Sequence, residues 1–180
     1  MDKKTHDKKG IVLIGMAGAG KSTVGKVLAK KLGFEFVDGD KYIEQKEQMK
    51  LCEIISQKGE NYFLNIEEKS LMELLPIERK IISPGGSAVY SDRLMQTFKK
   101  NSLVVLLEVP FYMIQKRISK RWDRGGGIVH RGHQSLRAVF QERKRLYKKY
   151  ADLKINCQGK DLNGIVDQII NSRAMSQLRH

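Results

Sequence analysis

Eight consecutive residues near the start of the chain have the types and spacing of a phosphate-binding loop. Positions 15–22 read GMAGAGKS and fit the pattern G-x-x-x-x-G-K-[ST] at every fixed position. Such glycines let backbone N–H groups turn inward around a phosphate, and the positive end of the following helix faces the same anion. Lys21 would then span the β and γ oxygens of ATP, and the hydroxyl of Ser22 would ligate Mg²⁺. The pattern predicts nucleotide contacts from Gly15, Ala17, Gly18, Ala19, Gly20, Lys21, Ser22 and Thr23.

A pair of carboxylates follows shortly after this loop. Asp38 and Asp40 flank Gly39 behind an apolar run, and alternation in an extended segment would point both side chains to one side. One could bind Mg²⁺ or its water while the other accepts the proton of an attacking hydroxyl. The alternative is that Asp40 is a helix cap, because aspartate is favoured at that position. The residues alone leave these two roles for Asp40 evenly balanced.

Two glycine-containing segments later in the chain could contact the reactants. Residues 83–86 read SPGG, where paired glycines would let a substrate approach the backbone, although a plain turn is the alternative. Residues 121–133 read RWDRGGGIVHRGH, a composition typical of a mobile lid that closes on ATP. Arg117, Arg121 and Arg124 would then bring positive charge to the transferred phosphoryl group. Solvated surface charge is the alternative for these arginines.

Short apolar runs and helical spacing place these residues in an alternating order of elements. Apolar runs predict strands at 11–14, 34–37, 80–83, 103–109 and 153–157. Helical spacing is found at 21–32, at 41–75 with an interruption at Gly59, and at 92–99, 111–119, 134–149 and 162–172. The phosphate-binding pattern therefore lies between a buried strand and a helix, as it must. Alternating strands and helices predict an α/β fold, with a parallel sheet and helices on both faces.

The length, hydrophobic content and net charge of the chain limit which class of protein it can belong to. A chain of 180 residues with 41% hydrophobic content fits one compact domain, expected at 10–173, with tails at 1–9 and 174–180. No stretch approaches the roughly 20 apolar residues of a membrane span, so we expect a cytoplasmic protein without a membrane partner. The net charge of +14 suits a protein that handles phosphates, and no nucleic-acid-binding pattern accompanies it. We expect no specific nucleic-acid partner, and a monomer.

The sequence resembles the shikimate kinase family from about residue 10 to residue 170. The segments that carry the resemblance are GMAGAGKSTVGKVLAKKLGFEFVDGD, GENYF with IEE, IISPGGSAVY, VVLLEV and ERKRLYKKYAD. The resemblance implies a three-layer P-loop NTPase fold with a five-stranded parallel sheet, a lid at about 121–133 and a substrate-binding subdomain. It also implies ATP-dependent phosphorylation of a hydroxyl of a small hydroxylated acid. The family's acceptor is shikimate, which becomes shikimate 3-phosphate in aromatic amino-acid biosynthesis.

The resemblance further implies roles for residues on the acceptor side. Asp38 would help to organise Mg²⁺, and Asp40 would bind the acceptor hydroxyl and serve as its base. The backbone of Gly85 and Gly86 would contact the substrate, and Arg143 would bind its carboxylate.

On the ATP side, the resemblance matches the lid arginine of the family to Arg124 and its adenine-stacking arginine to Arg117. The catalytic set would then be Lys21, Asp40 and Arg124, with Ser22 and Asp38 at the metal.

The chain departs from the family pattern at two places. The family has Phe-Arg where this chain reads Phe63-Leu64, so an apolar side chain replaces a guanidinium that grips the acceptor. The lid pattern Arg-Pro-Leu-Leu appears as RGGG at 124–127. If shikimate is the acceptor, Arg143 would hold its carboxylate, alone or with one other cation such as Arg137 or Arg93. The alternatives are a kinase of another hydroxylated acid or amino acid such as homoserine, which Leu64 and Ser87 favour, and a nucleotide-binding regulatory protein without turnover.

Overall fold

The computed structural model describes residues 8–123, 128–132 and 135–178, and its centre is one parallel sheet. The strand order is β2-β3-β1-β4-β5, and every neighbouring pair is parallel. The strands are β1 (Ile11–Ile14), β2 (Glu35–Asp38), β3 (Lys80–Ser83), β4 (Leu103–Glu108) and β5 (Leu153–Asn156). The five predicted strands are therefore confirmed, with β1 and β3 at the predicted bounds.

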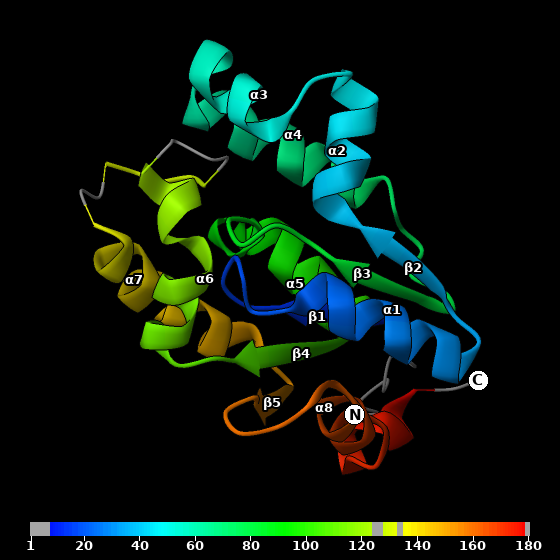
Figure 1. Ribbon diagram of the computed structural model, residues 1–180. Helices are drawn as coiled ribbons and strands as arrows, with labels where there is room; N and C mark the ends of the chain where they lie inside the picture. Colours follow the sequence, from blue (N-terminus) through cyan, green and yellow to red (C-terminus); the bar gives the residue numbers. More distant parts are fainter. Residues whose placement is uncertain (1–7, 124–127, 133–134, 179–180) are drawn as a thin grey trace.

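Helices cover both faces of this sheet, which gives three layers (Figure 1). Helix α1 contacts α8 as well as strands β1, β2 and β3, while α5 and α7 contact each other and β4. The α-helices are α1 (Lys21–Leu32), α2 (Gly39–Glu47), α3 (Leu51–Lys58), α4 (Glu60–Met72), α5 (Asp92–Asn101), α6 (Phe111–Asp123), α7 (Leu136–Tyr150) and α8 (Leu162–Ile170). Two short 3₁₀ helices are η1 (Ala88–Tyr90) and η2 (Arg173–Gln177). None of the helices in the described ranges is long and apolar enough to cross a membrane.

The segment predicted as one interrupted helix at 41–75 consists of three helices. The break at Gly59 is confirmed, since this residue has a φ of 84° between α3 and α4. A second break follows Gln48, whose φ of 51° ends α2 in the left-handed conformation. Sequence spacing missed this break because apolar residues continue through it without Gly or Pro.

Helix α6 extends further than predicted. It continues to Asp123, so the first three residues of the predicted lid are helical. The segment contains no Gly or Pro before residue 125, and Ile114 and Ile118, one turn apart, are both buried. Residues 124–127 and 133–134 of the predicted lid lie outside the described residues.

The predicted tails contribute contacts where the structure describes them. Lys8 pairs through its backbone with Leu178, and its ammonium lies 2.6 Å from a carboxylate oxygen of Asp152. The backbone of Lys9 bonds to that of Arg79 at 2.8 Å. Leu178 is buried in the main core, so residues 8, 9 and 178 belong to the folded unit.

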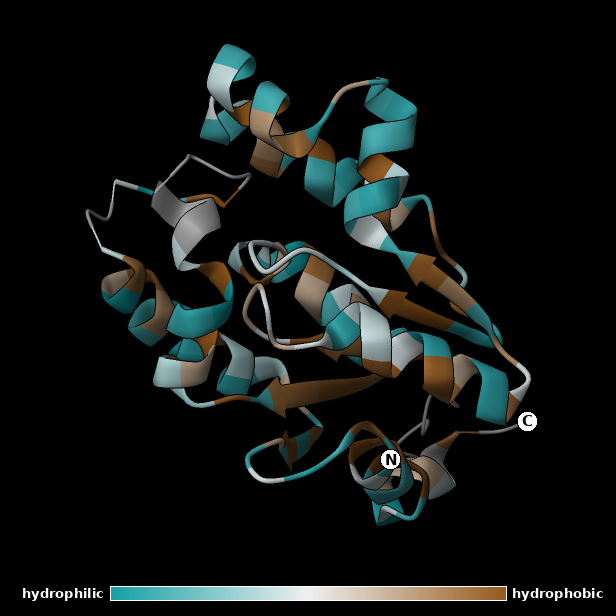
Figure 2. Ribbon diagram, viewed as in Figure 1, coloured by the Kyte–Doolittle hydropathy of each residue, from teal (hydrophilic) through white to brown (hydrophobic). Residues whose placement is uncertain are grey.

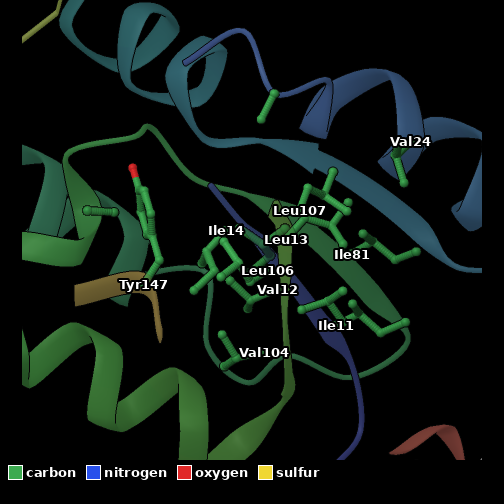
Figure 3. Packing of buried hydrophobic residues seen from close by; sticks show 14 of the residues in the cluster. Ile11, Val12, Leu13, Ile14, Val24, Ile81, Val104, Leu106, Leu107 and Tyr147 are labelled. Atoms are coloured by element: carbon green, nitrogen blue, oxygen red, sulfur yellow. The ribbon is translucent and has the colours of Figure 1, made fainter. Parts of the chain in front are cut away.

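Two hydrophobic clusters hold the structure together. The main cluster packs on the sheet, whose central strands are strongly hydrophobic (Figure 2), and it includes all of β1 (Figure 3). Both faces of β1 are covered, which explains why its residues form an uninterrupted apolar run. A smaller cluster joins α2, α3 and α4 to one residue of the loop after α6, and consists of Ile43, Leu51, Ile54, Phe63 and Val129. This second cluster packs a group of helices beside the carboxyl ends of the strands (Figure 1).

Candidate functional site

The predicted phosphate-binding loop connects β1 to α1. Gly18 and Gly20 have φ values of 77° and 92°, which L side chains rarely adopt, and the backbone of Ala19 bonds to Met16 at 3.0 Å. The first turn of α1 begins at Lys21 and contains no acidic residue. The loop therefore presents a compact turn and a positive helix end, the arrangement that binds an anion.

The ammonium of Lys21 lies against its own loop. Its Nζ donates hydrogen bonds to the carbonyl oxygens of Gly15 at 2.9 Å and Met16 at 3.3 Å. Burial lowers the pKa of Lys21, and the carboxylate of Asp40 partly opposes this shift. Neutral carbonyls are weaker partners for an ammonium than a phosphate oxygen, so an entering phosphate could replace them.

A cavity of about 250 Å³ brings most of the predicted site together at the carboxyl ends of the strands. Most of the lining comes from the phosphate-binding loop, the residues after β2 and the segment after β3, and Arg143 of α7 closes one side. Leu51, Phe63, Ile128 and Val129 add apolar side chains. The predicted residues that line it are Ala17, Gly18, Gly20, Lys21, Ser22, Thr23, Asp38, Asp40, Gly85, Gly86 and Arg143. Gly15, Ala19 and Arg117 are not among the lining residues. Arg124 lies outside the described residues.

The two aspartates after β2 have different surroundings. Asp38 is the N-cap of α2, and its side chain accepts a hydrogen bond from the backbone of Lys41 at 3.3 Å. Asp40 lies in the first turn of the same helix and lines the cavity. The alternative that Asp40 caps the helix is therefore wrong, because Asp38 occupies the capping position. The acceptor role of Asp40 stays a prediction.

The glycines after β3 leave room for ligand contact with the backbone. A methyl group added at Gly85 would lie 2.6 Å from Asp40 Oδ1, and one added at Gly86 would lie 3.0 Å from Arg143 Nη1. The first distance is shorter than real side-chain contacts and the second is tighter than most of them, so both positions favour glycine beyond what a plain turn requires. The hydroxyl of Tyr147 donates a 2.6 Å hydrogen bond to the carbonyl of Gly86 and holds this segment in place.

Arg143 is a deeply buried cation, only 1% exposed. Its Nη2 donates to the carbonyl of Val129 at 2.7 Å, and its Nε donates to the hydroxyl of Tyr90 at 3.2 Å. These bonds fix the guanidinium, while Nη1 lies beside Gly86 at the cavity wall. A fixed, buried guanidinium next to a cavity is suited to binding an anionic group.

The arginine predicted to stack on adenine contacts the phosphate-binding loop. Arg117 of α6 is exposed, and its Nη1 donates to the carbonyl of Gly18 at 2.8 Å. Beyond the predicted lid glycines, Ile128 and Val129 are buried and line the cavity. The carboxylate of Glu60 accepts hydrogen bonds from the backbone of both His130 and Arg131, which ties this loop to the first turn of α4.

Comparison with known proteins decides the family. The sequence matches the family described as shikimate kinase over residues 17–174. The chain belongs to the shikimate kinase family. It is 39% identical to a shikimate kinase of Sulfurihydrogenibium sp., with 90% of this chain and 96% of the relative covered. It is also 35% identical to a shikimate kinase of Persephonella marina, over 90% of this chain and 97% of the relative.

Solved structures agree with this membership of the shikimate kinase family. A shikimate kinase of Acinetobacter baumannii in complex with shikimate has a TM-score of 0.84 and 28% identity, and covers 98% of this chain and 99% of its own. A gluconokinase of Sinorhizobium meliloti, at 18% identity and a TM-score of 0.55, shares the fold. The chain therefore has the P-loop kinase fold and belongs to an ATP-dependent kinase family. The enzyme hypothesis is thereby favoured over the regulatory one.

Arg137 and Arg93 are the two candidates for a second cation in place of the family's arginine at position 64. Both lie away from the cavity. The guanidinium of Arg137 stacks on Phe111 at 5.1 Å, and that of Arg93 lies 3.7 Å from Glu68. Neither lines the cavity that contains Arg143. Leu64 itself packs against the smaller hydrophobic cluster.

Sequence reasoning missed Glu67, which lies one turn after Leu64 on α4. The residue is 1% exposed, and its Oε2 accepts a 2.7 Å hydrogen bond from the hydroxyl of Ser87. Burial raises the pKa of Glu67 to about 8, and the nearby Asp40 carboxylate adds to the shift. The sequence offers one weak signal for this residue, since helical spacing places it on the same face as Phe63 and Leu71.

Proposed function

We propose that this protein transfers the γ-phosphoryl group of ATP to a hydroxyl of shikimate and forms shikimate 3-phosphate. The observation that carries the proposal is the single cavity that joins Lys21 and Ser22 of the phosphate-binding loop to Asp40, Gly85 and Arg143. Phosphate-binding groups and a potential base thus face the same space as a buried cation. Membership of the shikimate kinase family supports the same conclusion.

The residues of the cavity would divide the work of in-line phosphoryl transfer. The acceptor's hydroxyl oxygen attacks the γ-phosphorus, the bond to the bridging β–γ oxygen breaks, and ADP leaves. Asp40 accepts the hydroxyl proton, and Lys21 neutralises negative charge on the phosphate oxygens. Outside the cavity, Arg117 lies where it could contact the nucleotide, since it already bonds to Gly18. We also propose Arg124 as the lid cation, on the resemblance alone.

The donor set of the site fits Mg²⁺ bound together with nucleotide phosphates. Ser22 and Asp38 line the cavity with oxygen donors, and the cap bond of Asp38 uses only one of its two carboxylate oxygens. In the described ranges no group of three or more His, Cys, Asp or Glu side chains could hold a metal alone. Mg²⁺ commonly has few protein ligands and completes its shell with water and phosphate. When bound, it would neutralise charge on the β and γ phosphates.

The acceptor assignment rests on Arg143 and the adjoining glycines. Shikimate carries a carboxylate and several hydroxyls, so it needs a cation at one end of the cavity and a base at the other. Arg143 Nη1 lies beside Gly86 and Asp40 Oδ1 beside Gly85, on two consecutive residues. The Acinetobacter baumannii relative, which was solved in complex with shikimate, supports this choice.

Coupled measurement of ADP release tests the proposal, with ATP, Mg²⁺ and a panel of shikimate, homoserine and other hydroxylated acids. We expect turnover with shikimate at a kcat/KM of about 10⁴ M⁻¹s⁻¹ or more, the low end of ordinary enzymes. Arg143→Met should raise the KM for shikimate roughly 10- to 100-fold and leave the KM for ATP unchanged, because one charge-assisted contact is lost. Arg145→Met, at an exposed position of the same helix, is the control. Turnover of homoserine without turnover of shikimate would contradict the proposal.

We further propose that the enzyme is a cytoplasmic monomer and acts in aromatic amino-acid biosynthesis. The product of the proposed reaction supports the assignment to that pathway. Light scattering after size-exclusion chromatography measures the oligomeric state, and a mass near 20.6 kDa is the expected result.

A further inference from the structure

A second cavity, of about 430 Å³, borders the phosphate-binding loop and is separate from the acceptor site. Its volume is within the range of about 300–1,000 Å³ that is usual for sites of small molecules. None of the described residues that line it also lines the cavity of Lys21, Asp40 and Arg143. The proposed reaction therefore gives this second cavity no role.

The walls of the second cavity are mostly apolar and include several aromatic rings. The end of β4 with the start of α6, helix α7, and Met16 of the phosphate-binding loop form these walls. Phe111 and Phe140 meet edge to face, with their ring centres 5.3 Å apart. The ring of Tyr147 lies near Leu106, which lines the same cavity (Figure 3). Because aromatic rings pack favourably against the edges and faces of other rings, the cavity suits an aromatic group.

Three polar side chains, those of Glu108, Lys144 and Asn156, lie at the partly exposed rim of the second cavity. The carboxylate of Glu108 lies 3.9 Å from the ammonium of Lys148, so its charge already has a partner. The amide oxygen of Asn156 accepts a 3.0 Å hydrogen bond from the backbone of Gln158, which leaves the amide NH₂ group as a donor. Lys144 has no hydrogen bond or ion pair with any residue in the described ranges. The rim therefore offers a cation and an N–H donor to a ligand.

Charge complementarity selects among ligands that carry an aromatic ring. The charges of Glu108 and Lys148 offset each other, so Lys144 gives the rim an excess of positive charge. The guanidinium of Arg137, 5.1 Å from the ring centre of Phe111, adds to this positive field. A carboxylate balances the excess, whereas an amine would be repelled by it and a zwitterionic amino acid would leave it uncompensated.

We propose that the second cavity is a binding site for a small aromatic carboxylate. The ring of the ligand packs against Phe140 and Tyr147, and its carboxylate accepts hydrogen bonds from Lys144 and Asn156. The site borders the acceptor cavity without opening into it, since the hydroxyl of Tyr147 holds the carbonyl of Gly86 at 2.6 Å. This inference goes beyond the proposed reaction and does not depend on which acceptor the enzyme uses.

Isothermal titration calorimetry of the full chain with 3-phenylpropionate at pH 7 tests the inference. We expect this compound to bind, and 3-phenylpropanamide, which has the same shape without the charge, to bind about 10-fold more weakly. Lys144→Glu should weaken the binding of 3-phenylpropionate by more than about 10-fold, because it sets a negative charge against the carboxylate. Arg145→Glu is the matched control, since it changes the net charge equally at an exposed position of α7 outside the cavity. Absence of binding, or equal weakening by the two substitutions, would overturn the inference.

A second measurement locates the bound compound. In protein labelled with ¹³C at methionine methyl groups, the signal that Met16→Leu removes should shift when 3-phenylpropionate is added, because Met16 lines the cavity. An unchanged Met16 signal, or displacement of the compound by shikimate or ATP, would place it elsewhere and contradict the proposal. Tighter binding of L-phenylalanine than of 3-phenylpropionate would show that Glu108 holds an ammonium, and the assigned class of ligand would be wrong. None of these measurements requires turnover, so failure of the proposed function would be seen separately.

Discussion

Burial of Glu67 should make the stability of the protein depend on pH in a way that one substitution removes. The ordinary pKa of a glutamate is 4.5, and in the folded protein that of Glu67 is about 8. Between these values the folded state holds a proton that the unfolded chain releases, so stability falls as pH rises. This contribution is fully present below pH 4.5 and is lost as pH rises through about 8. Glu67→Gln has no proton to lose at this position.

The size of this loss of stability follows from the shift in the pKa of Glu67. One pH unit in this window corresponds to about 1.4 kcal/mol per proton, so the wild type should lose about 2.5 kcal/mol relative to Glu67→Gln between pH 5.5 and 7.5. With a urea m-value of about 2 kcal/mol/M, the difference between the two unfolding midpoints should change by about 1 M. The amide of glutamine can still accept the hydrogen bond from Ser87, so packing changes little.

The assay is urea unfolding followed by circular dichroism at pH 5.5, 6.5 and 7.5 for the wild type and the variant. The other titratable groups are the same in both proteins. The difference between their unfolding free energies at each pH therefore reports the titration of Glu67 alone. The control Glu68→Gln should follow the wild type at every pH, because the Glu68 side chain is 30% exposed and bonds to Ser91. Stability curves that run parallel for the wild type and Glu67→Gln would refute the reasoning, since Glu67 would then be ionised in the folded state.

Four further substitutions test the cavity and the core. Lys21→Ala should lower kcat at least 100-fold while the circular dichroism spectrum is unchanged, because it removes a cation from the phosphates. Arg117→Ala should raise the KM for ATP, as its contact with Gly18 lies at the phosphate-binding loop, and should leave the KM for shikimate unchanged. Leu28→Ala should cost about 2–5 kcal/mol in urea unfolding, because Leu28 is fully buried. Leu64→Arg should lower the KM for shikimate by at most about 100-fold, and an unchanged KM would contradict this.

The parts of the fold that depend on neighbours in sequence could be predicted closely. Strand β1 and helix α1 have the predicted bounds, because a β-branched run, a glycine loop and a glycine at the helix end are local signals. The end of α2 at Gln48 could not be predicted, since the residue that takes the left-handed conformation there is not a glycine. The phosphate-binding loop was likewise visible from its pattern alone.

Acceptor-side residues were harder to identify because their roles depend on contacts between distant segments. Arg143 lies in a basic helix among many exposed cations, and only the resemblance distinguished it from its neighbours. The fold explains the difference: Arg143 points at Val129 and Tyr90 and is buried, whereas Arg145 is exposed. Glu67 and Glu68 are adjacent acidic residues, and only the helical spacing from Phe63 and Leu71 favours Glu67 as the buried one.

The residue at position 64 and the charge on Glu67 are physically linked. A buried carboxyl beside a guanidinium is ionised, because the cation offsets the cost of burying its charge. With Leu64 one turn away, position 64 supplies no such cation, and burial raises the pKa of Glu67 to about 8 although Arg143 and Lys21 oppose the shift. An arginine at this position would supply one cation and create one anion, whereas leucine leaves both groups neutral, so the net charge facing the acceptor is the same in the two cases. The replacement therefore need not abolish the binding of an acid.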